Sequence, residues 1–208
     1  MCRGEEAFSP PPSFSTPVVS LPDLGDPIDA DAISERRART GLANVERFRG
    51  AINASAERIG VAPSLLAGFM SRESHGVDID EEHGTGLGLM QVSHTSFPRT
   101  TVDGANQTYD QWKEAWIARG RPAQENIDLG ADILAEKIAY FDANFPALPA
   151  PDRLRASMAA YNAGSEHVAQ YITDQDGVSN VDTATTDGDY TRDVTIRARI
   201  EKDEGGFL

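Results

Sequence analysis

Glu73 is the residue whose type and position point most directly to chemistry. It follows Leu66 by seven residues, Phe69 by four and Met70 by three, so its carboxylate should lie on the apolar face of a helix. Burial and the negative end of the helix dipole both disfavour the charged carboxylate, and we therefore expect its pKa to be raised. A carboxyl group that is protonated near neutral pH is what glycoside hydrolysis requires of its general acid. The alternative is an ordinary glutamate at a helix end that turns to solvent or pairs with Arg72.

A glycine-rich segment, residues 84–91, follows this helix. Its glycines would let the backbone approach a ligand closely, or they simply form a loop with positive φ angles. Neither GxGxxG nor GxxxxGK[ST], the phosphate-binding patterns, is present. The acidic run 78–82 hints at a calcium loop, but His83 and Leu89 stand where such a loop has its glycine and its last acid. The four histidines form no metal-binding pair either, so we expect no metal and no cofactor.

Two further segments carry side chains that could contact a sugar. The first is residues 161–164, Tyr-Asn-Ala-Gly, which is also a typical helix end with Asn and Gly as cap residues. The second is the pair Trp112 and Trp116 on one short predicted helix. Aromatic rings make good sugar platforms, but we favour a hydrophobic anchor that holds this helix to the body of the protein.

Composition excludes several classes of partner. The chain has 208 residues and a formal net charge of −14, so its field repels polyanions and argues against a nucleic-acid partner. No apolar run approaches the roughly 18 residues of a membrane span, and we expect no membrane partner. The single cysteine, Cys2, excludes an intramolecular disulfide and a thiolate metal site.

The hydrophobic pattern predicts a mostly α-helical fold with little or no β-sheet. Residues 1–30 form a Pro-rich, acidic leader without periodicity, and residues 31–208 are expected to form a single domain. Thr108 and Gln111 form a capping box that should begin one of its helices. Apolar residues recur at helical spacing in six segments, namely 33–59, 63–75, 109–119, 127–145, 154–161 and 190–198.

Four motifs in this order resemble those of the goose-type lysozymes, which are relatives of the soluble lytic transglycosylases. The motifs are Ser-Arg-Glu-Ser-His at 71–75, Gly-Leu-Gly-Leu-Met-Gln-Val at 86–92, Ala-Tyr-Asn-Ala-Gly at 160–164, and Asp189-Tyr190 with Asp193-Val194. The resemblance extends from about Leu42 to Lys202, most of the chain.

The resemblance implies a lysozyme-like catalytic domain with a substrate cleft, in which Glu73 is the catalytic acid. The residues that it implies around the bound sugar are Met90, Gln91, Ser93, Tyr161, Asn162 and Tyr190. It also implies a secreted, extracellular enzyme, although no signal peptide is visible in residues 1–30.

The departures from the family bear on mechanism. Two aspartates are thought to hold the attacking water in the animal enzymes, and the matching positions here are Glu82 and Ser93. Glu82 could orient a water for inversion, which needs the two carboxyl groups about 6.5 to 9.5 Å apart. If no carboxylate holds the water, the C6 hydroxyl of the sugar can attack instead, as in a lytic transglycosylase. The sequence leaves both routes open.

Several functions are therefore expected or kept open. The first is a muramidase that hydrolyses the β-1,4 bond between N-acetylmuramic acid and N-acetylglucosamine in peptidoglycan, with Glu73 as general acid and Glu82 orienting water. The alternatives are a lytic transglycosylase, a chitinase acting on N-acetylglucosamine polymers, which suit an acidic surface, and a non-catalytic sugar-binding protein. We expect a monomer whose partner is one of these polysaccharides.

Overall fold

The protein is described by a computed structural model over residues 32–80, 86–97, 108–175 and 177–208. The predicted leader, 1–30, and the candidate water-orienting residue Glu82 lie outside the described residues. The helices are α1 (Ala32–Glu46), α2 (Arg49–Ile59), α3 (Pro63–Ser74), α4 (Tyr109–Ala118), α5 (Ala123–Asn144), α6 (Ala150–Ala163), α7 (Ser165–Gln175), the short 3-10 helices η3 (Val181–Ala184) and η4 (Thr186–Gly188), and α8 (Tyr190–Asp203). Among the described residues there is no strand beyond one isolated bridge between Leu87 and Val92, which confirms the predicted mostly α-helical fold.

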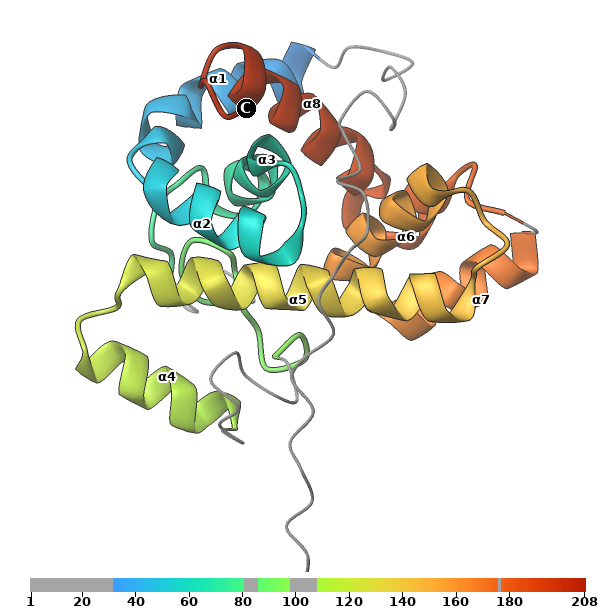
Figure 1. Ribbon diagram of the computed structural model, residues 1–208, viewed down its shortest axis with the longest axis horizontal. Coiled ribbons are helices and arrows are strands. Elements are labelled where there is room, and N and C mark those ends of the chain that lie inside the picture. The colour runs from blue at the N-terminus through green and yellow to red at the C-terminus, as the bar shows by residue number, and fades with distance from the viewer. Residues whose placement is uncertain (1–31, 81–85, 98–107, 176) are drawn as a thin grey trace, which may run out of the picture.

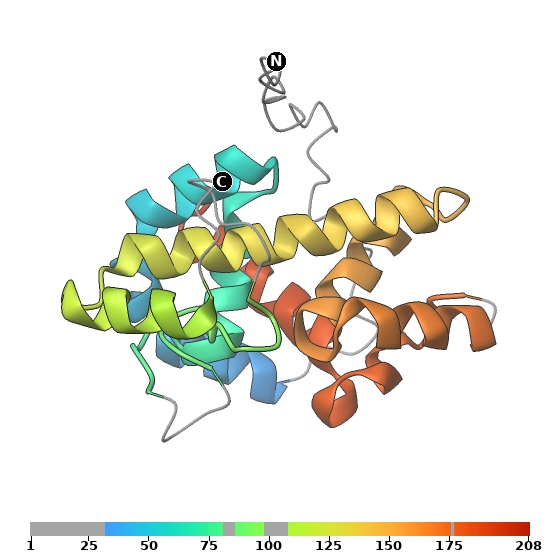
Figure 2. The ribbon, with the colours of Figure 1, turned by 90° about the horizontal axis from the view of Figure 1, so that it is seen from below.

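Helix α5 runs along the long axis of the molecule, with α1–α4 around one half and α6 and α7 at the other (Figures 1 and 2). Helices α3 and α8 form the most extensive helix pair. Gly68 makes this close packing possible, because a Cβ atom at this position would lie 2.9 Å from the backbone of both Val194 and Ala198. None of the helices in the described part of the chain is long and apolar enough to cross a membrane.

The core consists of two hydrophobic clusters that meet along α6. The larger cluster joins α2, α3, α5 and α8 through fully buried residues such as Ile52, Phe69 and Leu134. The smaller cluster joins the end of α5 to α6, α7 and η3. Tyr161 belongs to the larger cluster and its neighbour Ala160 to the smaller one, so the end of α6 lies where the two cores meet.

The predicted single helix over 33–59 is wrong, because the chain breaks at residues 47–48 into α1 and α2. The two helices bury their apolar faces against different partners, α1 against α8 and α2 against α5. One straight helix could not reach both. The apolar spacing alone did not show the change of direction.

Helix α4 begins with the predicted capping box. The Thr108 hydroxyl accepts a hydrogen bond from the Gln111 amide, and the Gln111 side chain accepts one from the Thr108 amide. Trp112 and Trp116 stack with ring centroids 5.4 Å apart and are almost completely buried. They are therefore the hydrophobic anchor that the sequence favoured over a sugar platform.

Candidate active site

Glu73 lies in the last turn of α3, on the side that faces two buried tyrosines. Its carboxylate is partly buried and accepts a hydrogen bond from the hydroxyl of Tyr190, the first residue of α8. The Phe69 ring packs against both tyrosines, with centroids 4.9 Å from Tyr161 and 6.2 Å from Tyr190. Three helices, α3, α6 and α8, thus bring one carboxyl group and two phenols together.

The pKa of Glu73 is raised to about 7, chiefly because burial disfavours the charged carboxylate. The hydrogen bond from Tyr190 and the positive charges of Arg72 and Arg197 oppose this shift but do not cancel it. The raised pKa agrees with the expectation from the sequence. Burial also raises the pKa of Tyr190 and of Tyr161 well above 10, so both phenols keep their protons and Tyr190 stays a donor.

Residues 86–92 form a tight turn beside α3, the helix that carries Glu73. Leu87 and Val92 exchange two backbone hydrogen bonds of 2.9 and 3.0 Å. A Cβ atom at Gly86 would lie 2.2 Å from the carbonyl oxygen of Gln91. Glycine is therefore required where these two parts of the turn approach each other. Gln91 itself has a φ of 47°, a conformation uncommon outside glycine, and its side chain donates to the carbonyl of Gly88.

Asn126 fastens this turn to α5. It is fully buried; its side-chain oxygen accepts from the Met90 amide at 2.8 Å and its side-chain nitrogen donates to the Leu87 carbonyl at 3.0 Å. From the other side, the Ser74 hydroxyl at the end of α3 donates to the Leu89 carbonyl at 2.7 Å. The turn is therefore held between the helix of Glu73 and α5.

Replacing Asn126 by alanine should lower the free energy of unfolding by about 2 kcal/mol, because the buried Met90 amide would lose its partner and the Leu87 carbonyl would keep only the bond from Val92. Asn144→Ala on the same helix is the matched control, since its side chain bonds an exposed carbonyl of the helix itself. Chemical denaturation of the three proteins measures the effect. Equal losses in Asn126→Ala and Asn144→Ala would show that the turn does not depend on this side chain.

The structure places the six residues that the resemblance assigned to the sugar in different surroundings. Tyr161 and Tyr190 lie at Glu73, and Gln91 is partly exposed in the adjoining turn. Met90 is fully buried, and its carbonyl accepts a 2.9 Å hydrogen bond from the Tyr161 hydroxyl. Its side chain therefore belongs to the core rather than to an exposed surface.

Asn162 and Ser93 have side chains that are already engaged. The exposed Asn162 accepts a hydrogen bond of 2.8 Å from the Thr186 amide and so ties the end of α6 to η4. The Ser93 hydroxyl bonds the hydroxyls of Thr95 and Ser96 at 3.0 and 2.9 Å. At the position where the resemblance has an aspartate, the chain thus carries a cluster of neutral hydroxyls.

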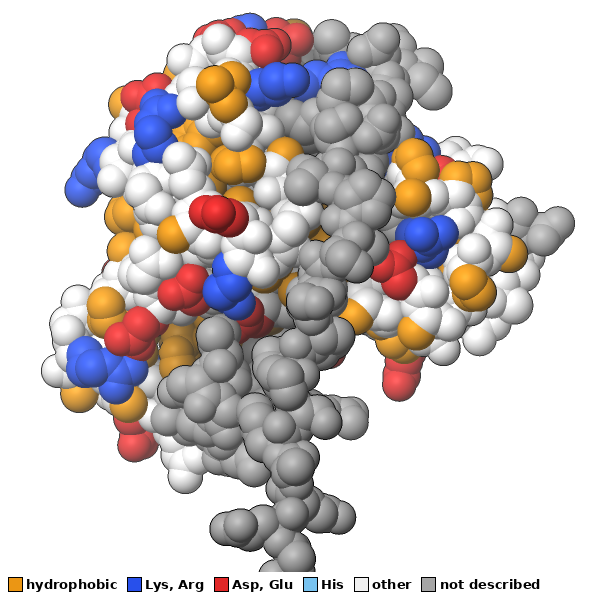
Figure 3. All heavy atoms as spheres, in the orientation of Figure 1, with side chains coloured by type: hydrophobic (Ala, Val, Ile, Leu, Met, Phe, Trp, Pro, Cys, Tyr) orange, Lys and Arg blue, Asp and Glu red, His pale blue; other side chains and the backbone are white. Residues whose placement is uncertain are grey.

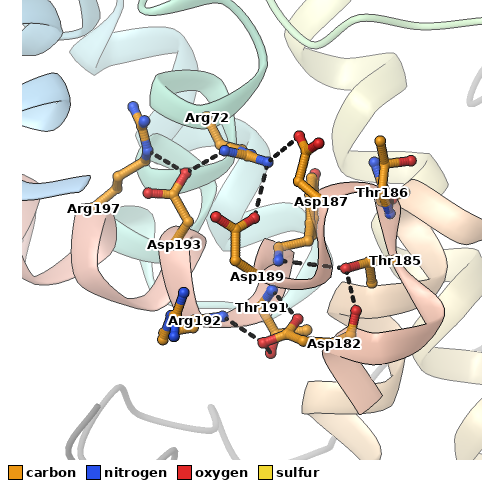
Figure 4. Close-up of polar contacts among 12 residues, drawn as sticks. Arg72, Asp182, Thr185, Thr186, Asp187, Asp189, Thr191, Arg192, Asp193 and Arg197 are labelled. Atoms are coloured by element: carbon orange, nitrogen blue, oxygen red, sulfur yellow. Dashed lines mark hydrogen bonds and ion pairs between the residues drawn. The ribbon is translucent and has the colours of Figure 1, made fainter. Parts of the chain in front are cut away.

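Sequence reasoning missed the charged network around Arg72, which does not pair with Glu73. Arg72 instead binds Asp193 at 2.9 Å and Asp189 at 3.2 Å, and Arg197 binds the same oxygen of Asp193 at 2.8 Å (Figure 4). The sequence feature that could have indicated this network is the spacing of Asp193 and Arg197, which lie four residues apart on the helix of Tyr190.

The start of α8, and with it Tyr190, is fixed by Asp182 of η3. Its carboxylate accepts hydrogen bonds from the backbone amides of Thr191 and Arg192 and from the Thr191 hydroxyl (Figure 4). A carboxylate at a helix N-terminus binds otherwise unpaired amides and stabilises the helix. None of these hydrogen bonds of Asp182 involves Arg72.

The chain is similar in sequence to known lysozymes. The family model Lysozyme g matches residues 28–205. The chain is 30% identical over 178 residues to lysozyme g of Takifugu rubripes and 32% identical over 184 residues to lysozyme g of Epinephelus coioides, with 84% of both chains covered in each comparison. It is 27% identical over 172 residues to lysozyme g of Gallus gallus, covering 81% of this chain and 70% of the relative.

Proposed function

The chain belongs to the lysozyme g family and is a glycoside hydrolase, and we propose that it is a muramidase with Glu73 as its general acid. Its substrate would be the β-1,4 bond between N-acetylmuramic acid and N-acetylglucosamine in bacterial peptidoglycan. The observation that carries the proposal is the partly buried carboxyl group of Glu73, with a pKa of about 7 and a phenol donor, Tyr190, on its Oε1. Comparing peptidoglycan cleavage by the native protein and Glu73→Gln tests it, as argued in the Discussion.

The proposed chemistry follows from the protonation state of Glu73. Near neutral pH a substantial fraction of the carboxyl groups holds a proton, which one oxygen can give to the glycosidic oxygen as the bond breaks. The Tyr190 hydroxyl then stabilises the carboxylate that forms, because a hydrogen bond to the charged form favours it. Tyr161 is held by its hydrogen bond to the Met90 carbonyl and packs against Phe69, one turn before Glu73 on the same helix.

For the second reactant we propose a water oriented by Glu82, which attacks from the opposite face and inverts the anomeric centre. A specific observation favours a second route. The Ser93 position carries a hydroxyl bound to Thr95 and Ser96 instead of a carboxylate, so one of two expected water-holding acids is missing. Attack by the sugar's own C6 hydroxyl, which gives the anhydro end of a lytic transglycosylase, needs no such acid.

Peptidoglycan and chitin can be compared directly as substrates. The chain carries a net charge of −14, and on the face in Figure 3 acidic and basic side chains are interspersed without a continuous basic surface. Such a surface does not attract an anionic cell wall and suits a neutral polymer equally well. Chitin oligomers are therefore the natural competitor substrate. We propose that the protein acts on peptidoglycan as an extracellular monomer, with chitin as the alternative polymer.

The rate should fall on the alkaline side with an apparent pKa of about 7, because the general acid must hold its proton. Above this pH, kcat/KM on soluble peptidoglycan fragments should drop about tenfold for each further pH unit. Steady-state rates from pH 5 to pH 9 measure the limb, with circular dichroism at each pH as the control for folding. A constant rate from pH 6 to pH 9 would exclude Glu73 as the proton donor.

A further inference from the structure

Asp193 is a buried carboxylate that the proposed reaction does not use. Its Oδ2 atom accepts hydrogen bonds from Arg72 Nη1 at 2.9 Å and from Arg197 Nε at 2.8 Å. Asp193 and Arg197 are each only 1% exposed, and the other oxygen of Asp193 has no hydrogen-bond partner among the described residues. A buried charge is costly unless it is paired. The side chains of Asp193, Arg72 and Arg197 are therefore held in this paired geometry.

Arg72 connects this carboxylate to the reacting group. It precedes Glu73 in the chain, and its guanidinium carbon lies 5.6 Å from the centroid of the Tyr190 ring. Its second nitrogen, Nη2, lies 3.2 Å from Asp189 and 3.7 Å from the exposed Asp187 (Figure 4). The guanidinium is thus fixed against the phenol that donates to Glu73.

The charges around Glu73 come from every helix packed on it. Its own helix supplies Arg72, α8 supplies Arg197 and the neutral Tyr190, and α6 supplies the neutral Tyr161. His75, Arg37, Asp187 and Asp189 lie farther out in the same electrostatic network. The two guanidinium groups both favour the ionised carboxylate, and Asp193 is the carboxylate that binds both.

We propose that Asp193 is a positioning residue of the reaction, which holds Arg72 against the Tyr190 ring and offsets the positive charge of Arg72 and Arg197 beside Glu73. The proposal rests on the role of Glu73 as general acid. Without Asp193, two uncompensated cations would favour the carboxylate of Glu73, and the acid would lose its proton at a lower pH. Without Arg72, the remaining aspartates would have the opposite effect.

The test is the alkaline limb of the pH–rate profile in variants of opposite charge change. We expect Asp193→Asn to move the limb down by about one pH unit, a tenfold loss of the protonated acid on that side, and Asp189→Asn to move it less in the same direction. Arg72→Gln should move the limb up. If Asp193→Asn does not fold, the opposite shifts of Asp189→Asn and Arg72→Gln still decide the proposal.

Asp174→Asn is the matched control, because it removes the same charge from an exposed side chain of α7 that bonds Gln170 rather than Arg72. It should leave both the stability and the alkaline limb in place. If the alkaline limbs of Asp189→Asn, Arg72→Gln and the native protein coincide, whatever their rates, the inference about Asp193 is overturned and the proposed function is not affected. A Glu73→Gln variant with native activity would instead overturn the proposed function on which the inference rests.

Discussion

Replacing Glu73 by glutamine should reduce hydrolysis of peptidoglycan by at least about a hundredfold, the lower bound of what a positioned general acid contributes. Glutamine keeps the size of the side chain and an oxygen that can accept the hydrogen bond from Tyr190, but it has no proton to give to the leaving oxygen. The fold should remain intact. Because burial disfavours the charge of Glu73, the variant should be at least as stable as the native protein above pH 7.

Release of reducing ends from purified peptidoglycan measures this loss, and thermal unfolding shows that the variant is folded. Glu57→Gln on the exposed side of α2 is the matched control, since it removes one negative charge from a helix that carries none of the site's residues. We expect it to retain native activity. Activity of Glu73→Gln above a few per cent of the native rate would remove Glu73 from the mechanism.

Replacing Glu201 by glutamine should remove a strong dependence of stability on pH. Glu201 lies on α8 and is fully buried. Burial, followed by repulsion from Glu46, raises its pKa to about 8, although Arg197, Arg49 and a hydrogen bond from Ser71 oppose this shift. Its stabilising contribution is therefore fully present below its unfolded-state pKa of 4.5 and is lost as the pH rises through about 8.

The free energy of unfolding should therefore be equal in the native protein and Glu201→Gln at pH 4.5. At pH 8 the variant should be more stable by on the order of 4 kcal/mol, since each unit of the pKa difference between the unfolded and folded states corresponds to about 1.4 kcal/mol. Urea denaturation at both pH values measures this difference, and pH 4.5 serves as the internal control. Two proteins whose stabilities change in parallel between these pH values would contradict the raised pKa of Glu201.

Local patterns in the sequence predicted much of the fold and the central residue of the site. Spacing alone placed Glu73 on the apolar face of α3, and the capping box of Thr108 and Gln111 marked the start of α4. Both depend on residues within one or two helical turns. Tyr190 was named only through the family resemblance, as a sugar contact, and its hydrogen bond to Glu73 was not predicted because it joins residues 117 positions apart.

Features that depend on tertiary packing could not be predicted in this way. The break between α1 and α2 arises because the two helices pack against α8 and α5, and helix α7 was missed because only Val168 and Ile172 of its residues are buried. The polar residues Asn126 and Asp193 lie on otherwise apolar helix faces, which was a signal. Their partners, a turn and an arginine on other segments, were not visible in the sequence.

The glycines of residues 84–91 show how a correct pattern can have another cause. They indicated either a backbone that approaches a ligand closely or a plain loop with positive φ angles, and the close approach in the described part is to the chain itself. Gly86 faces the Gln91 carbonyl, and Gly88, with a φ of 76°, packs on the Asn126 side chain. Glycine was required there to build the turn beside α3.

The central claim, that this family member is a peptidoglycan hydrolase, is tested most directly by digestion in water enriched in heavy oxygen. Purified peptidoglycan and chitin oligomers are incubated with the protein, and the new chain ends are analysed by mass spectrometry. Our account predicts N-acetylmuramic acid ends that carry one heavy oxygen atom, from attack by water, with peptidoglycan as the polymer that is cleaved. Unlabelled 1,6-anhydromuramic ends would contradict hydrolysis, make the protein a lytic transglycosylase and remove Glu82 from the mechanism.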